Sequence, residues 1–131
     1  MNKSILLAII IGAIIIIGGG YLLFAGKSQN TNNLKEAQEI KEFTVTAREF
    51  GFDPKTINIK SGDKIRIVLN NIGTAPHNLM IEGLDIGTKT ISNGNSDVLE
   101  FLAPSAGDYT FFCAVGNHRG SGMEGKLMVE N

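Results

Sequence analysis

The chain has no tryptophan, one cysteine and only two histidines among its 131 residues. A single cysteine cannot form a disulfide within the chain, which excludes the disulfide frameworks of many small secreted domains. Twelve Lys and Arg residues stand against thirteen Asp and Glu residues, for a net charge of -1. Nucleic-acid binders normally carry a basic excess or a basic stripe, so no nucleic-acid partner is expected. The length sets a limit of one ordinary domain, which excludes the large nucleotide-dependent enzymes.

The long apolar run of the chain covers residues 5–25, which contain no charged side chain. As a helix rising about 1.5 Å per residue it would be about 32 Å long, close to the bilayer core of about 30 Å. We expect residues 1–26 to form an uncleaved membrane anchor with a transmembrane helix. The alternative is a signal segment that is removed after export, with Leu23-Phe24-Ala25 as a weak cleavage site. Both interpretations predict an extracytoplasmic domain, either periplasmic or at the cell surface.

Residues 27–42 differ sharply from the run before them. Their first half is rich in Ser, Asn, Gln and Thr, which is typical of a solvated tether. Residues 34–42 could form a short helix with only Leu34, Ala37 and Ile40 available for packing. We therefore expect a polar linker over residues 27–42.

From Phe43 onward the sequence alternates apolar and polar residues with a period of two. This period, with its β-branched and aromatic residues, predicts short strands separated by Gly, Asn, Asp and Pro turns. Residues 82–97 are rich in Gly, Ser, Asn and Asp and are expected to be a long excursion between strands. The pattern predicts an all-β antiparallel sandwich over residues 43–131. The seven expected strands are 43–47, 56–60, 64–70, 78–81, 98–101, 109–112 and 126–130.

The residues that carry chemistry gather after the strand at 109–112. Cys113, His118 and Met123 follow with a C-x4-H-x4-M spacing, and glycines at 116, 120 and 122 allow the loop to fold back. The second histidine, His77, follows the turn at residues 70–73. Two imidazoles, one thiolate and one thioether are the ligands of a blue-copper electron-transfer site. The sequence therefore predicts a metal site at one end of the sandwich.

Each of these residues also has a plainer interpretation. Cys113 could be a small buried apolar residue, His77 a surface residue and Met123 a core residue. Structural zinc prefers four firm Cys and His ligands, of which the chain has three. A Cys–His nucleophile would also need an oxyanion site and a substrate cleft, for which the sequence gives no indication. Met80 and Met128 fall within strand patterns and are expected in the core, with Met80 as the alternative axial candidate.

At these residues the sequence resembles the cupredoxins, the small blue copper proteins. The resemblance covers residues 43–131. Residues 52–63 are similar to the family's F-x-P-x-x-I-x-V-x-x-G-D segment, and residues 107–113 to its G-x-Y-x-F-x-C strand. Residues 70–78 resemble the plastocyanin-type turn of the first ligand, whereas the long ligand loop and residues 125–129 resemble the rusticyanin and sulfocyanin type.

The resemblance implies a Greek-key sandwich that holds one copper ion. It implies that His77 and His118 bind through ring nitrogens, Cys113 through its thiolate and Met123 axially. Because Pro76 precedes the first histidine, as in plastocyanins, four ligands are expected and not five. Asn78 is expected to tie the two ligand segments together and to steady the sulfur.

The function that follows is one-electron transfer with copper cycling between Cu(II) and Cu(I), without an organic substrate and without enzymatic activity. Donor and acceptor redox proteins are expected to dock transiently near His118, over a small apolar patch with Ala114, Val115 and Pro76. Membrane contact is expected through the N-terminal helix. The alternatives are a copper-binding or copper-handling protein and an accessory electron-donor subunit of a membrane redox complex.

Overall fold

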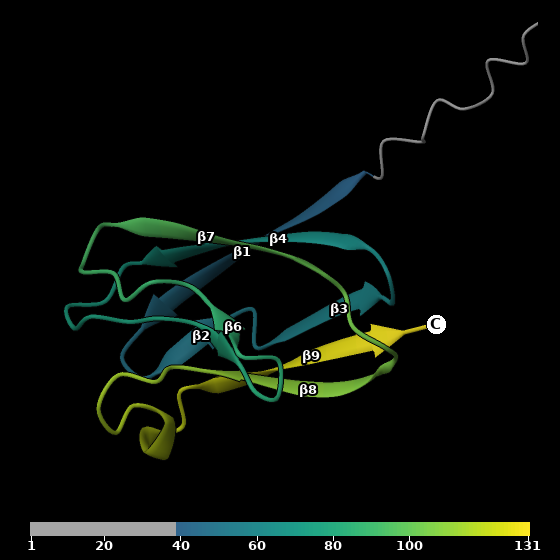
Figure 1. The fold of residues 1–131 in the computed structure, drawn as a ribbon. Coiled ribbons are helices and arrows are strands. Elements are labelled where there is room, and N and C mark those ends of the chain that lie inside the picture. The colour runs from purple at the N-terminus through teal and green to yellow at the C-terminus, as the bar shows by residue number, and fades with distance from the viewer. Residues whose placement is uncertain (1–38) are drawn as a thin grey trace, which may run out of the picture. The chain divides into compact units, whose positions relative to one another are not determined.

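The computed structural model describes residues 39–131, which form two facing β-sheets (Figure 1). The all-β sandwich predicted from the alternating pattern is confirmed. No helix among residues 39–131 is long and apolar enough to cross a membrane. The predicted anchor over residues 1–26 and most of the predicted linker lie outside the described residues.

The strands form two sheets. The first has the order β2 (Gly51–Asp53), β1 (Ile40–Arg48), β4 (Lys64–Asn71), β7 (Ser96–Leu102). The second has the order β3 (Thr56–Lys60), β9 (Glu124–Glu130), β8 (Gly107–Phe112), β5 (Met80–Ile81), β6 (Ile86–Gly87).

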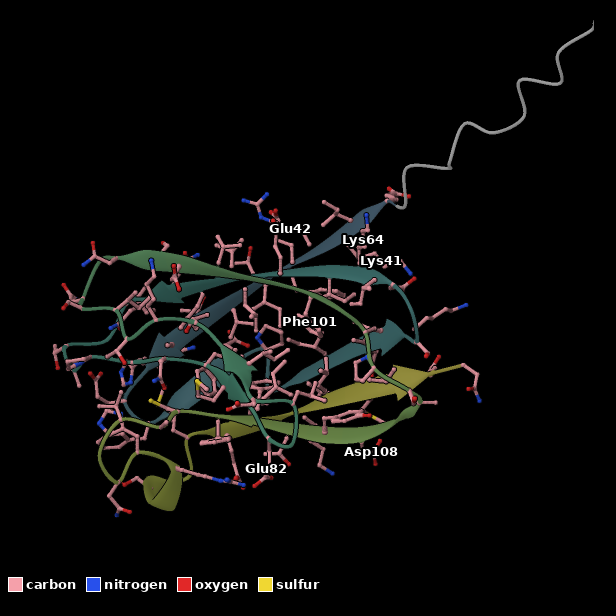
Figure 2. All side chains as sticks on the ribbon, viewed as in Figure 1. Lys41, Glu42, Lys64, Glu82, Phe101 and Asp108 are labelled. Atoms are coloured by element: carbon pink, nitrogen blue, oxygen red, sulfur yellow. The ribbon has the colours of Figure 1, made fainter. Side chains whose placement is uncertain are left out.

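The core lies between the two sheets and follows from the alternation. In β4 every second residue is buried, and β3 and β9 show the same period. Phe111 and Phe52 meet edge to face with ring centroids 5.4 Å apart, a favoured aromatic geometry. Phe101 also points between the layers (Figure 2). The inward-facing aliphatic residues of these three strands are Ile57, Ile59, Ile65, Ile67, Leu69, Leu127 and Val129.

The prediction of a purely antiparallel sandwich is wrong, because both sheets are mixed. β1 pairs with β4 in parallel, and β3 pairs with β9 in parallel. The chain crosses from one sheet to the other between β2 and β3 and crosses back before β4. β4 therefore returns beside β1 in the same direction, and such crossings leave no mark on the two-residue period of any strand.

The first strand begins at Ile40, three residues before the expected start at Phe43. The expected short helix over residues 34–42 is therefore wrong at its C-terminal end, where residues 40–42 pair with Lys64–Arg66. Lys41 also donates to Asp63 at 2.6 Å, just before the start of β4. These ladder and ion-pair contacts are long-range, whereas a helix over residues 34–42 with three apolar residues would have little to stabilise it.

Two short strands were not expected, β2 and β6. β6 lies inside the excursion at residues 82–97. Ile91, in the same excursion, forms an isolated bridge with His77.

The expectation that Met128 is a core residue is wrong, because it occupies an outward position of β9 and is 37% exposed. Met80 is half-buried on β5 and pairs with Gly87 and Phe112.

Candidate metal centre

Three of the four predicted ligands meet at one end of the sandwich. His77, Cys113 and His118 each offer a donor atom, and these atoms lie within 4.8 Å of one another. The Cys113 Sγ is 3.5 Å from Nδ1 of His118 and 3.9 Å from Nδ1 of His77. His77 comes from the segment between β4 and β5, and the other two from the loop after β8. In Figure 1 this loop, with its single helical turn, lies at the end opposite the C-terminus.

The spacing of these atoms fits a single metal ion. Two donors at about 2.1 and 2.3 Å from an ion, with about 120° between them, are about 3.8 Å apart. Both histidines turn the same nitrogen, Nδ1, toward the sulfur. Cys113 and His77 are fully buried, and a buried imidazole and thiol facing each other are donors that a soft cation would satisfy. The residues present therefore fit the predicted group.

Met123 is fully buried and is tied by its backbone to the other two loop residues. Its carbonyl accepts the N–H of Cys113 at 3.1 Å, and its own N–H donates to the carbonyl of His118 at 3.0 Å. The C-x4-H-x4-M segment is thus a closed loop whose two ends are hydrogen-bonded to each other. Glycines make this closure possible, because Gly116 and Gly122 have φ angles of 49° and 94°.

Arg119 fixes the outer side of this loop. Its guanidinium makes two hydrogen bonds to Glu82, at 2.9 and 3.0 Å, and a further contact to Glu124 at 3.3 Å. It also lies 4.3 Å from the centre of the Phe112 ring, in cation–π geometry. The single turn η1 (Arg119–Ser121) after His118 is therefore anchored to β8, to β9 and to the residue that follows β5.

The turn before His77 is held by a buried asparagine. The side-chain amide of Asn71 donates to the carbonyls of Ala75 and Ile91, and its oxygen accepts the N–H of Gly73. His77 itself exchanges two backbone hydrogen bonds with Ile91 across an isolated bridge. Because buried polar groups are costly unless paired, this network fixes the position of the His77 backbone.

Asn78 joins the two segments that carry the donor atoms, as predicted. Its oxygen accepts the N–H of Ala114 at 2.8 Å, and its amide donates to Thr90 Oγ1 at 3.2 Å. The residue after His77 is thus bonded to the residue after Cys113. This contact confirms the expected tie between the two ligand segments.

The His77 side chain is fully buried and has the Glu49 carboxylate beside it. Burial lowers the pKa of His77, and repulsion from His118 acts in the same direction, whereas the nearby Glu49 opposes both. Glu49 Oε1 is 3.6 Å from His77 Nε2 and 2.6 Å from the N–H of Ala75. Hydrogen bonds, first of all from Ala75, lower the pKa of Glu49 to about 2. The net lowering of the His77 pKa favours the neutral imidazole, which is the form that binds metals.

His118 is the half-buried member of the cluster and meets Phe50. The two rings are 4.9 Å apart, and Phe50 is 46% exposed. Phe50, Glu49 and Asn71 were not singled out by the sequence pattern, because the first two lie just beyond the last alternating residues of β1. Asn71 looked like an ordinary turn residue, and only its complete burial marks it as structural.

Comparison with known proteins identifies the family of the chain. The family model described as "Cupredoxin-like domain" matches residues 14–129. Plastocyanin of Prochlorothrix hollandica is 31% identical over 88 residues, which cover 60% of this chain and 63% of that protein. Plastocyanin of Nostoc punctiforme is 34% identical over 93 residues, covering 60% and 64%. The chain thus spans less than two thirds of the length of these curated relatives.

Solved structures share the fold at lower sequence identity. Auracyanin from Roseiflexus castenholzii superposes with a TM-score of 0.64 at 22% identity, covering 69% of this chain and 97% of that one. Auracyanin A from Chloroflexus aurantiacus, described as a "blue" copper protein, gives 0.65 at 18% identity, covering 70% and 100%. A copper-containing nitrite reductase from Thermus scotoductus gives 0.60 at 22% identity, but only 28% of that chain is covered. The small proteins are therefore matched along nearly their whole length and the enzyme over one part.

Proposed function

The chain belongs to the cupredoxin-like domain family, and from that premise we propose that it is a one-electron transfer protein with a mononuclear type 1 copper site. The observation that carries the proposal is the meeting of one buried thiol and two imidazoles within 4.8 Å, from two separate segments. Plastocyanins and a blue copper auracyanin are among its relatives and structural neighbours. The cofactor is one copper ion.

We assign each ligand a role from its chemistry and position. His77 and His118 would bind copper through Nδ1, Cys113 through its thiolate and Met123 through its thioether. This trigonal His2Cys set with a weak axial Met is the ligand set of blue-copper electron-transfer sites. Bound copper would accept one electron from a donor protein, going from Cu(II) to Cu(I), and return to Cu(II) on passing it to an acceptor protein.

The protein contributes a frame that keeps the ligands in place. The backbone bonds of Met123 to Cys113 and His118 close one ligand segment, and Asn78 bonds that segment to the other. Ligands fixed in this way would move little between the Cu(II) and Cu(I) states of the ion, so little structural rearrangement would accompany each electron transfer. No substrate bond is made or broken in this function, so the protein is a carrier and not an enzyme.

Electrons enter and leave through the half-buried edge of His118. We assign to the surrounding apolar patch the predicted residues Ala114, Val115 and Pro76, together with Phe50, which is 46% exposed and whose ring lies 4.9 Å from that of His118. Small exposed apolar patches of this kind support transient docking of a donor and an acceptor protein.

The docking surface can be tested with the protein itself, because two copies exchange electrons through the same patch. Val115→Glu places like charges face to face in that encounter, so the self-exchange rate should fall by about tenfold or more at low salt. Asp108→Lys, on β8 away from the ligand loop, is the control and should leave the rate within twofold. Equal rates in both variants would contradict docking at His118.

We also propose the domain order and the location that the sequence predicts. Residues 1–26 anchor the chain in a membrane, a polar linker follows, and the copper domain begins at β1 on the extracytoplasmic side. A tether of this kind raises the local concentration near membrane redox complexes without a tight interface. The test is fractionation of the full chain against one lacking residues 5–25, with intact mass of the recovered protein. Recovery of only a shortened, soluble form would contradict the anchor.

Electron transfer is tested on the copper-loaded protein by voltammetry and by self-exchange. A reversible one-electron wave, fast self-exchange and slow loss of copper to a chelator are expected. Rapid loss of copper with slow self-exchange would contradict the carrier and favour copper handling.

A further inference from the structure

Glu49, in the turn between β1 and β2, is anchored to the segment that leads into His77. Its Oε1 accepts the backbone N–H of Ala75 at 2.6 Å and the hydroxyl of Thr74 at 3.2 Å. These residues precede the histidine by two and three positions. The carboxylate is therefore a fixed part of the ligand turn and not a freely moving surface charge.

The turn leaves room for this carboxylate only because residue 73 is glycine. A Cβ at Gly73 would lie 2.7 and 2.8 Å from the two Glu49 oxygens and 3.0 Å from the Arg48 Cα. Contacts of that length require a shift of the backbone or of the carboxylate. The Glu49 carboxylate therefore occupies its present position because residue 73 has no side chain.

The far side of the His77 ring faces the same carboxylate. Its Nε2 is buried, has no hydrogen-bond partner among the described residues and lies 3.6 Å from Glu49 Oε1. Its Nδ1 faces Cys113. A neutral imidazole carries one N–H, so a ring that offers Nδ1 to a metal must hold its hydrogen on Nε2. A buried N–H needs an acceptor, and Glu49 is the acceptor beside it.

We propose that Glu49 is a positioning residue that holds His77 with its hydrogen on Nε2 and its Nδ1 free, and that its negative charge favours Cu(II) over Cu(I) in the proposed site. The second half of this inference rests on the proposed function. A carboxylate bonded to the outer nitrogen of a ligating histidine fixes the ring and raises its basicity. A fixed negative charge beside the ligand also stabilises the higher charge of the ion.

The first experiment uses the full chain without copper. Nitrogen-15 NMR of the imidazoles should show His77 with its hydrogen on Nε2, and that hydrogen should exchange slowly with solvent. Glu49→Gln retains an acceptor oxygen and should keep the slow hydrogen, whereas Glu49→Ala should lose it. A wild-type His77 with its hydrogen on Nδ1 would overturn the assignment, as would an unchanged slow hydrogen in Glu49→Ala.

The second experiment measures the reduction potential of the copper-loaded variants. Removing the charge in Glu49→Gln should lower the preference for Cu(II) over Cu(I) by about tenfold, which raises the potential by about 59 mV for one electron. Glu100→Gln on β7, opposite Arg66 in the strand register, removes the same charge away from the site and is the control. A potential that moves no more in Glu49→Gln than in Glu100→Gln would overturn the charge effect.

The two experiments separate this inference from the proposed function. If the wild-type chain fails to form a thiolate–copper site, the proposed function fails. The NMR spectra of the copper-free protein still show which nitrogen of His77 carries the hydrogen. Only the role of Glu49 fails if copper binds as proposed, the slow His77 hydrogen is unchanged in Glu49→Ala, and the potential moves no more in Glu49→Gln than in Glu100→Gln.

Discussion

Asn78 connects the backbone beside Cys113 to the segment that carries His77. It is a buried side chain whose oxygen accepts the N–H of Ala114, and whose amide reaches Thr90. A bond of this kind acts whether or not copper is present, because both partners belong to the chain. Its contribution can therefore be measured as stability of the copper-free protein.

Asn78→Ala should destabilise the copper-free protein by about 1–3 kcal/mol, because the Ala114 N–H loses its acceptor in a partly buried position. Chemical denaturation gives the free energy of unfolding. Asn58→Ala, at an outward position of β3, is the control and should change stability by no more than about 0.5 kcal/mol. Equal effects at the two positions would show that Asn78 contributes no such tie.

Gly125, two residues after Met123, allows β9 to pack against the core. A Cβ there would meet the Phe111 ring and the carbonyl of Lys55. Phe111 is fully buried, so its ring has no free space to move into. The glycine is thus required by close packing and not by an unusual backbone conformation.

Gly125→Ala should therefore destabilise the fold by about 1–3 kcal/mol through overpacking. Gly51→Ala is a matched control in β2, because a Cβ at that position has open space. Thermal and chemical unfolding of the two variants compare the effects directly. A Gly125→Ala protein as stable as the Gly51→Ala protein would contradict the packing argument.

Among the elements, long strands with strict alternation were predictable, whereas the short strands β2 and β6 were not. β4 and β9 bury every second residue, so their sequences indicate both that they are strands and which side chains face the core. β2 and β6 have three and two residues, too few to show any period. Their pairing depends on the neighbouring strands, which the sequence does not indicate.

The start of β1 shows how long-range contacts decide an element boundary. Lys41 donates to Asp63 Oδ2 at 2.6 Å, and Asp63 also accepts the N–H of Lys60. Figure 2 shows Lys41 and Lys64 together where the described chain begins. The hydrogen bond from Lys41, the largest cause, lowers the pKa of Asp63 below its ordinary value of 3.8.

This lowered pKa gives a pH dependence with a definite sign. The folded carboxyl gives up its proton more readily than the unfolded one, so its contribution to stability is complete above about pH 4. The contribution is lost as the pH falls through the lowered pKa of the folded state. The stability difference between wild type and Asp63→Asn should thus be constant near neutral pH and shrink below about pH 4.

Urea unfolding of both proteins between pH 7 and pH 2.5 measures this difference, with Asp108→Asn as the control for loss of one surface carboxylate. A wild-type advantage that stays the same down to the lowest pH would contradict a lowered pKa at Asp63.

For the molecule as a whole, the meeting of His77, Cys113 and His118 was predictable because cysteine and histidine are rare in this sequence. The chain has one cysteine and two histidines, and all three lie in the segments that follow β4 and β8, so no other combination of these residue types was available. The C-x4-H-x4-M spacing with its glycines indicated that the loop closes on itself, which the backbone bonds of Met123 now describe.

The residues that surround the candidate site could not be predicted from the sequence. Glu49 and Phe50 meet His77 and His118 across more than twenty intervening residues. Their type and local pattern are those of an ordinary exposed turn. Such contacts follow from how β1 and β4 lie side by side, and the parallel pairing that brings them together was itself not predicted.

The most direct test of the copper site is the visible absorption and EPR spectrum of residues 27–131 after addition of one equivalent of Cu(II). The proposed ligands predict an intense blue or green band and a narrow copper hyperfine splitting, both lost in Cys113→Ser. Asn58→Ser, on the outer face of β3, should leave both signals unchanged. A pale spectrum like that of aqueous copper, or a blue spectrum that survives Cys113→Ser, would contradict a thiolate copper site.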